Sequence, residues 1–160
     1  MRTRVAGLLM GLALGIGPAG AGVPDAVGTV KELSLAGAKA VASAAASEAK
    51  KNSAGGAIAI VDSGGHLLYL ERLDGTFPAA AAVALEKART AAVFRRDTRA
   101  FEDAIRNGRV ALTAVGVMMP LQGGVPIVID GAVVGAIGVS GALSAQQDED
   151  IAKAGARTLE

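Results

Sequence analysis

Two pairs of short apolar runs, each pair divided by turn-forming residues, constrain the fold of this chain most strongly. The first pair is residues 57–61 and 66–73, separated by Asp-Ser-Gly-Gly. The second pair is residues 125–129 and 132–140, separated by Asp130-Gly131. Asp-Gly between apolar runs is a strong short-range signal for a β-hairpin. We therefore expect two antiparallel hairpins.

Helices are expected before, between and after these hairpins. Ser144 followed by Gln147 forms a capping box for the last helix, and Ser34 is a favourable N-cap for the first. The expected helices run from Ser34 to about Lys51, from Pro78 to about Phe94, from Thr98 to about Asn107, and from Ser144 onward. Segregated hairpins and helices favour an α+β fold with a mainly antiparallel sheet.

The expected helix at 78–94 carries a flat face of small residues. That face consists of Ala84, Leu85, Ala88, Ala91 and Ala92, and the opposite face of Glu86, Lys87, Arg89 and Thr90. A flat alanine face allows another backbone to approach closely, either from the sheet or from a second subunit. The apolar segment 110–119 has no clear period, so a helix and a buried loop both stay open for it.

The N-terminus has the pattern of a secretory signal peptide. Arg2 and Arg4 precede an apolar stretch, residues 5–16, that is too short to span a bilayer, and Ala19-Gly20-Ala21 supplies a cleavage pattern. We expect cleavage after Ala21, which places the protein in the periplasm or outside the cell, with no stable membrane insertion afterwards. Residues 22–32 are then a flexible leader and residues 33–160 a single domain.

The composition excludes several classes of function. The chain has no Cys and one His, which excludes disulfides, cysteine nucleophiles and zinc sites built on several histidines. Beyond residue 21 it has 14 Lys and Arg against 15 Asp and Glu, so it offers no basic excess to nucleic acid. Aromatic residues make up only 2% of the chain, too few for the stacking platforms that single-stranded nucleic acids need.

Four segments, in this order, resemble the GlcG/HbpS-like family, which also occurs as the C-terminal domain of PduO-type proteins. They are Ile60–Leu67, Lys87–Arg96, Leu121–Pro126, and Val134–Gly141 followed by Gln146–Glu149. The resemblance covers nearly all of the chain after the leader. It implies a profilin-like α+β fold and a homo-oligomer, often an octamer. It also implies haem or a corrinoid-related partner, and haem degradation in some members, so enzymatic activity stays open.

His66 is the leading candidate for an axial haem ligand, because imidazole nitrogen binds iron well. The alternative role for this side chain is to order the turn that precedes it. Tyr69 and Met118 are weaker candidate ligands, as is Met119. Two methionines in sequence are also typical of core or interface packing.

The densest basic cluster of the sequence is Arg95-Arg96, with Arg89 and Arg99 nearby. Guanidinium groups suit carboxylates, either haem propionates or small organic acids. The alternative is a solvated helix end whose cations lie near the helix C-terminus. Arg89 departs from the family pattern, which has an aromatic residue at this position in many relatives.

Two groups of glycines are also considered as candidate sites. Gly123 and Gly124 can bring bare backbone to a pocket wall or form a turn. Gly135, Gly138 and Gly141 are spaced by three residues; this spacing does not match a dinucleotide-binding turn, and close packing of strand against helix is the favoured reading. The candidate cofactor-binding residues are therefore His66, Arg89, Arg95, Arg96, Gly123 and Gly124, and no catalytic residue is assigned.

Three functions follow from these patterns. The first is an exported oligomer that binds haem or a related tetrapyrrole. The second is a small organic-acid-binding protein or enzyme that uses Arg95 and Arg96. The third is a structural or partner-binding oligomer with no small ligand.

Overall fold

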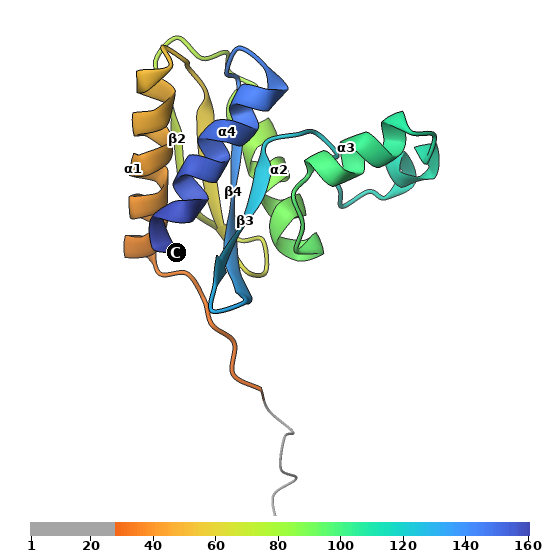
Figure 1. The fold of residues 1–160 in the computed structure, drawn as a ribbon, viewed down its shortest axis with the longest axis horizontal. Helices are drawn as coiled ribbons and strands as arrows, with labels where there is room; N and C mark the ends of the chain where they lie inside the picture. The colour runs from red at the N-terminus through yellow and green to blue at the C-terminus, as the bar shows by residue number, and fades with distance from the viewer. Residues whose placement is uncertain (1–27) are drawn as a thin grey trace, which may run out of the picture. The chain divides into compact units, whose positions relative to one another are not determined.

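The two expected hairpins form one four-stranded antiparallel sheet in the computed structural model, which describes residues 28–160 (Figure 1). β1 (Ala57–Asp62) and β2 (Leu67–Arg72) form the first hairpin. β3 (Gly124–Ile129) and β4 (Ala132–Ser140) form the second. β1 and β4 pair at the centre, so the strand order is β2-β1-β4-β3. This arrangement confirms the α+β class and the antiparallel sheet.

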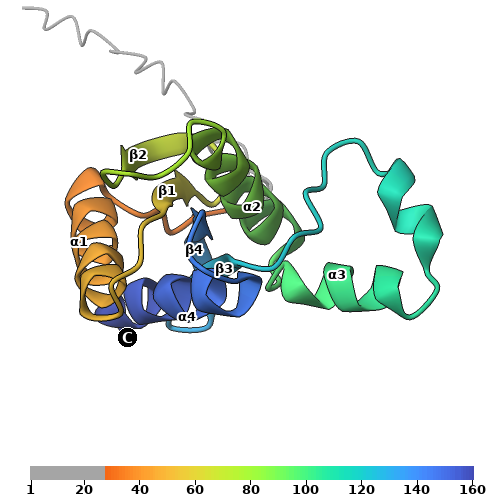
Figure 2. The same ribbon diagram turned by 90° about the horizontal axis from the view of Figure 1, so that it is seen from above.

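Helices cover both faces of the sheet (Figure 2). α1 (Leu35–Lys51) and α4 (Ala145–Ala156) pack on one face, and α2 (Ala80–Phe94) packs on the other. A short 3-10 helix, η2 (Arg157–Leu159), follows α4. Residues 31–160 form one compact unit.

The two faces of the sheet differ in side-chain size, and this difference positions α2. Ile58 and Ile60 of β1 pack with α1 and α4, whereas Ala57 and Ala59 pack with the alanines of α2. On β4, a Cβ atom at Gly138 would lie 2.1 Å from the carbonyl oxygen of Ala84. Helix and strand backbones are therefore in direct contact. The flat alanine face packs on the sheet of its own chain, and Gly138 serves close packing.

The helix ends follow the expected chemistry in part. Ser34 Oγ accepts the N–H of Gly37, and Ser144 Oγ accepts the N–H of Gln147, both at 3.1 Å. Thr98 precedes α3 (Arg99–Arg106), but its side chain does not cap that helix. Its hydroxyl instead donates to the carbonyl of Leu121 at 2.6 Å and accepts the N–H of Gly124 at 2.9 Å. Pro78 lies in a turn before α2, which begins two residues later.

α3 and the following segment extend away from the sheet (Figures 1 and 2). The segment at 110–119 contains a short 3-10 helix, η1 (Val110–Ala114), and then a loop with exposed and half-buried residues. It is therefore neither an α-helix nor a buried loop. Phe94 at the end of α2 meets Phe101 of α3 edge to face, with ring centres 5.2 Å apart. We call residues 99–120 the arm.

The predicted signal peptide, residues 1–21, and the first part of the predicted leader, residues 22–27, lie outside the described residues. Among residues 28–160, no helix combines the length and the apolar character that a membrane crossing requires.

Candidate functional site

The turn between β1 and β2 holds a histidine in a defined orientation. Asp62 Oδ1 accepts the backbone N–H groups of Gly64 at 2.9 Å and His66 at 2.8 Å. The same carboxylate lies beside the imidazole, with Oδ2 3.1 Å from Nδ1 of His66. Because Asp62 engages Nδ1, the other ring nitrogen, Nε2, is the one left for a ligand. The side chain of His66 is 82% exposed.

Hydrogen bonding keeps Asp62 ionised. Partial burial of this carboxyl opposes its charge and alone would raise its pKa. The backbone and side-chain hydrogen bonds from His66, together with the N–H of Gly64, outweigh burial and lower the pKa below its ordinary value. The carboxylate can therefore hold a proton on Nδ1 and leave Nε2 as a lone-pair donor.

Arg89 of α2 connects the helix to this turn. Its Nε donates to the carbonyl of Gly65 at 3.2 Å, and its Nη1 donates to Glu86 Oε1 at 2.6 Å. Gly65 has a φ of +85°, and a Cβ there would meet Val93 at 3.3 Å. The glycine thus permits both the left-handed turn and the close approach of α2.

A cavity of about 400 Å³ opens between the turn, α2 and the arm. Val93 and Val117 give it apolar walls, and both side chains are substantially exposed. The full lining is Gly64, Gly65, His66, Glu86, Arg89, Val93, Gly116 and Val117. The cavity therefore combines an imidazole, a guanidinium and apolar surface, which suits a ligand with a metal or polar centre, an acidic group and an apolar body.

Of the candidate residues from the sequence, His66 and Arg89 lie together at this cavity. Arg95 and Arg96 lie exposed at the C-terminal end of α2 and do not line this cavity. Arg95 is the C-cap of that helix in a left-handed conformation, with a φ of +51°. Their position matches the solvated helix end that the sequence left as an alternative.

The weaker candidate ligands lie elsewhere. Tyr69 of β2 packs toward the core that contains α1 and α4. Its hydroxyl donates to Glu71 Oε2 at 3.1 Å, and this bond together with the charge of Glu71 raises the pKa of Tyr69. Met118 and Met119 are half-buried at the end of the arm, where the N–H of Met119 donates to Thr90 Oγ1 at 2.8 Å.

Gly123 and Gly124 are both buried, and a side chain at Gly124 would collide with the backbone of α2, whereas one at Gly123 would collide with the carbonyl oxygen of Val139 on β4. A Cβ at Gly124 would lie 2.4 Å from the carbonyl oxygen of Lys87, and one at Gly123 would lie 3.0 Å from Lys87 Nζ. These glycines surround a lysine that the sequence analysis placed on the polar face of α2. That placement is wrong, because Lys87 is 3% exposed.

Lys87 has a buried acidic partner from α4. Its Nζ donates to Asp148 Oδ2 and to the carbonyl of Val139, each at 2.9 Å. The sequence contained a signal for its burial, because positions 80, 84, 87, 88 and 91 share one helical stripe. Because lysine is polar, the sequence pattern assigns Lys87 to the opposite, solvent-facing side of the helix. Its partner Asp148 could not be found from local pattern, since it lies 61 residues away.

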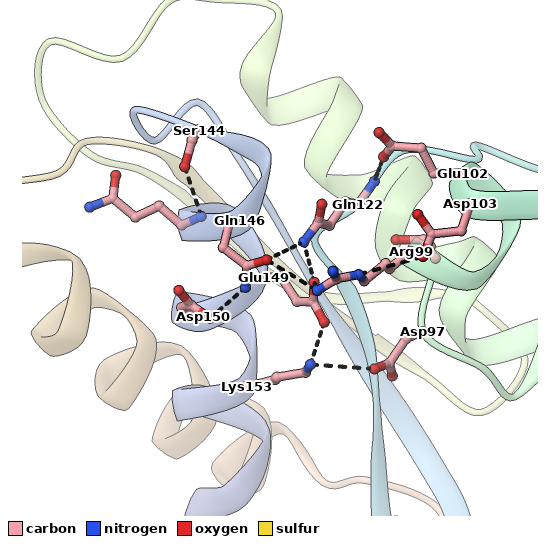
Figure 3. A network of polar contacts seen from close by, with 12 residues as sticks. Asp97, Arg99, Glu102, Asp103, Gln122, Ser144, Gln146, Glu149, Asp150 and Lys153 are labelled. Atoms are coloured by element: carbon pink, nitrogen blue, oxygen red, sulfur yellow. Dashed lines mark hydrogen bonds and ion pairs between the residues drawn. The ribbon is translucent and has the colours of Figure 1, made fainter. Parts of the chain in front are cut away.

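A polar network fastens the arm to α4 (Figure 3). Its centre is Glu149, which is 1% exposed and accepts hydrogen bonds from Gln122, Lys153 and Arg99. Burial opposes ionisation of Glu149, but the hydrogen bonds from Lys153 and Gln122 outweigh it and lower its pKa. At the edge, burial raises the pKa of Asp97, whose carboxylate lies 3.8 Å from Lys153 Nζ.

Comparison with protein families and known proteins identifies the family of this chain. The family model described as haem degrading protein HbpS-like matches residues 33–157. Protein GlcG of Escherichia coli strain K12 is 48% identical over 103 residues, which cover 64% of this chain and 77% of that protein.

Two solved structures show the same fold. The crystal structure of HbpS superposes with a TM-score of 0.78 at 32% identity and covers 84% of this chain and 95% of its own. A structure described as a PduOC:heme complex superposes with a TM-score of 0.72 at 25% identity and covers 81% of this chain and 96% of its own.

Proposed function

Because the chain belongs to the HbpS-like family, we propose that it is a binding protein for haem or a related tetrapyrrole, with His66 as the axial ligand. The family description and the haem complex of a structural relative support a haem-related ligand. The observation that carries the assignment to this site is the Asp62–His66 pair at the edge of the cavity.

The Asp62–His66 pair has the chemistry of a metal-binding histidine. Imidazoles that bind metals usually donate their second N–H to a carboxylate or carbonyl, which fixes the tautomer and raises the basicity of the ligating nitrogen. Asp62 supplies this carboxylate, and the two backbone N–H groups that it accepts hold it in place. Bound haem would supply an iron centre, and this chain would supply the oriented nitrogen.

Arg89 is the residue that fits a propionate. A guanidinium has five N–H donors, of which Gly65 and Glu86 use two; the described residues accept none of the others, which can reach an acidic group. Glu86 compensates part of the positive charge, and Val93 and Val117 offer apolar contact to the macrocycle. The donor set therefore fits haem.

The size and openness of the cavity support a ligand site that two subunits share. A volume of about 400 Å³ is small for a tetrapyrrole, and the apolar walls at Val93 and Val117 are open to solvent. We propose that the protein is a homo-oligomer in which a second copy covers the exposed side of the ligand. The N-terminal signal pattern supports export, so we propose a periplasmic or secreted binding protein.

Titration of the purified protein with haemin, followed at the Soret band, tests the proposal. We expect a saturating shift at a fixed ratio of haem to subunit, lost or greatly weakened in His66→Ala. Arg89→Gln is expected to weaken binding while leaving the shape of the spectrum unchanged, because it removes a propionate contact and keeps the iron ligand.

Arg109→Gln is the matched control, since Arg109 is exposed on the arm and does not line the cavity. Circular dichroism of each variant reports whether the fold is retained. A titration that does not saturate, or a folded His66→Ala variant with unchanged spectrum and affinity, would overturn the assignment.

A further inference from the structure

A second cavity, of about 290 Å³, lies at the junction of α2, the end of β4 and the start of α4. It shares no lining residue with the cavity beside His66. Its polar lining includes Lys87, Ser140 and Asp148, all of them buried, and its apolar wall includes Phe77 and Leu121. Small-molecule pockets occupy about 300–1,000 Å³, so this cavity lies near the lower end of that range and has room for a small organic molecule.

Lys87 has an N–H donor for which residues 28–160 supply no acceptor. An ammonium group has three N–H donors, and two of them are taken by Asp148 and the carbonyl of Val139. The two acceptors hold Nζ in place, so the third N–H is oriented before any ligand arrives. A buried ammonium donor of this kind forms strong hydrogen bonds with an anionic oxygen.

Ser140 presents a second unused donor on the same wall. The residue is 5% exposed, and within residues 28–160 its hydroxyl makes no hydrogen bond although it lines the cavity. The residue as a whole is buried, but its hydroxyl oxygen keeps accessible surface, so a ligand can reach it. Ser140 directly follows Val139, whose carbonyl holds Lys87 Nζ, so the two donors are neighbours. An acceptor in the cavity would satisfy both.

The charges around the cavity permit an anion. Asp148 neutralises Lys87, and the other lining carboxylate, Glu102, is paired with Arg106 at 2.8 Å and accepts the N–H of Gln122 at 2.6 Å. Ser144 and Ala145, at the N-terminus of the twelve-residue α4, also line the cavity. The positive end of the helix dipole therefore adds to the two donors.

We propose that this cavity binds a small carboxylic acid, through hydrogen bonds from Lys87 and Ser140 to the carboxylate. Phe77 and Leu121 contact its short carbon chain. The proposal moves the small-acid hypothesis from the exposed Arg95 and Arg96 to a buried site, and it is independent of haem binding.

Titration with sodium lactate, followed by amide NMR shifts of residues 141–146 and by calorimetry, tests this proposal. We expect saturation with one lactate per chain and a dissociation constant of about 1 mM or lower. Lactamide, which has a similar shape without the charge, is expected not to bind. Ser140→Ala removes a hydroxyl that makes no hydrogen bond to the part of the chain that the structure describes, and it is expected to weaken lactate binding about tenfold.

Two further variants complete the test. Ala145→Trp places a large side chain at the cavity and is expected to abolish lactate binding, whereas Ser47→Ala, an exposed control on α1, leaves it unchanged. His66→Ala is also expected to bind lactate normally, which separates this site from the haem proposal. The proposal is overturned if lactate does not saturate, if lactamide binds equally well, or if Ser140→Ala and Ala145→Trp both bind like the wild type.

Discussion

Nδ1 of His66 lies 3.1 Å from Oδ2 of Asp62, and the other oxygen of that carboxylate accepts two backbone N–H groups of the same turn. The turn thus fixes the carboxylate, and the carboxylate fixes the imidazole. A side chain that is mostly exposed is thereby oriented without being buried in a core.

Replacement of Asp62 by Asn is expected to weaken haem binding by about tenfold to a hundredfold, because the ligand loses its charged partner and its preferred tautomer. The amide oxygen can still accept the backbone N–H groups, so the fold should be retained. Asp74→Asn, in the exposed turn after β2, is the control and should bind haemin normally. Equal haemin affinities for Asp62→Asn and the wild type would show that Asp62 does not support a ligand.

Replacement of Lys87 by Met is expected to lower the free energy of unfolding by about 3–5 kcal/mol, because it leaves the buried Asp148 carboxylate without a counter-charge. The double variant Lys87→Met with Asp148→Asn should recover much of this loss, since Asn keeps an oxygen for the N–H of Ala142. Urea unfolding of the two variants and the wild type measures the difference. A single variant as stable as the wild type would contradict this account of the ion pair.

Replacement of Gly138 by Ala is expected to lower the free energy of unfolding by about 1–3 kcal/mol or more, because the Cβ of the alanine would overlap the backbone of α2 at Ala84 and Ala88. Gly116→Ala is the matched control, since a Cβ there meets nothing within 4 Å. Thermal unfolding of both variants provides the comparison. If both variants melt at the same temperature as the wild type, α2 does not contact the sheet as closely as described.

Glu149 is expected to make stability depend on pH in the acid range. Its pKa is lowered in the folded protein, so folding favours the ionised form. Its contribution is complete above the pKa of the unfolded chain, about 4.3, and is lost as the pH falls toward the folded value. Urea unfolding between neutral and acid pH should therefore show a steeper loss in the wild type than in Glu149→Gln.

Asp150→Asn, one residue along the same helix and exposed, is the control for that series and should change stability by no more than about 0.5 kcal/mol. A wild-type protein and a Glu149→Gln variant with parallel pH curves would contradict the role given to the buried carboxylate.

Local chemistry explains why much of the fold could be predicted. Asp130-Gly131 and the Asp62–His66 turn determine hairpins within a few residues, and Ser34 and Ser144 cap helices through their own hydroxyls. Helix ends with weaker sequence signals were predicted less accurately. The hydroxyl of Thr98, for example, accepts the N–H of Gly124 at the start of β3, a contact across 26 residues.

The candidate site was predictable only in part. The turn places His66 at an exposed edge, as its sequence indicates, but the cavity needs α2 and the arm as well. Arg95 and Arg96 look equivalent to Arg89 in sequence. However, α2 contains Arg89 and ends before Arg95, and of these three arginines Arg89 is the one that contacts the turn. Lys87 was missed because the helical stripe was assigned by residue polarity, and Asp148 was missed because it lies 61 residues from its partner.

The single histidine of this chain permits one decisive measurement. Protein grown with ¹⁵N-labelled histidine carries its only labelled imidazole at His66, so hyperfine spectroscopy of the ferric haem complex reports directly on the iron ligand. We predict a directly coordinated ¹⁵N coupling in the labelled protein, replaced by ¹⁴N in the unlabelled one. A stable haem complex whose spectrum is the same with and without the label would contradict His66 as the ligand.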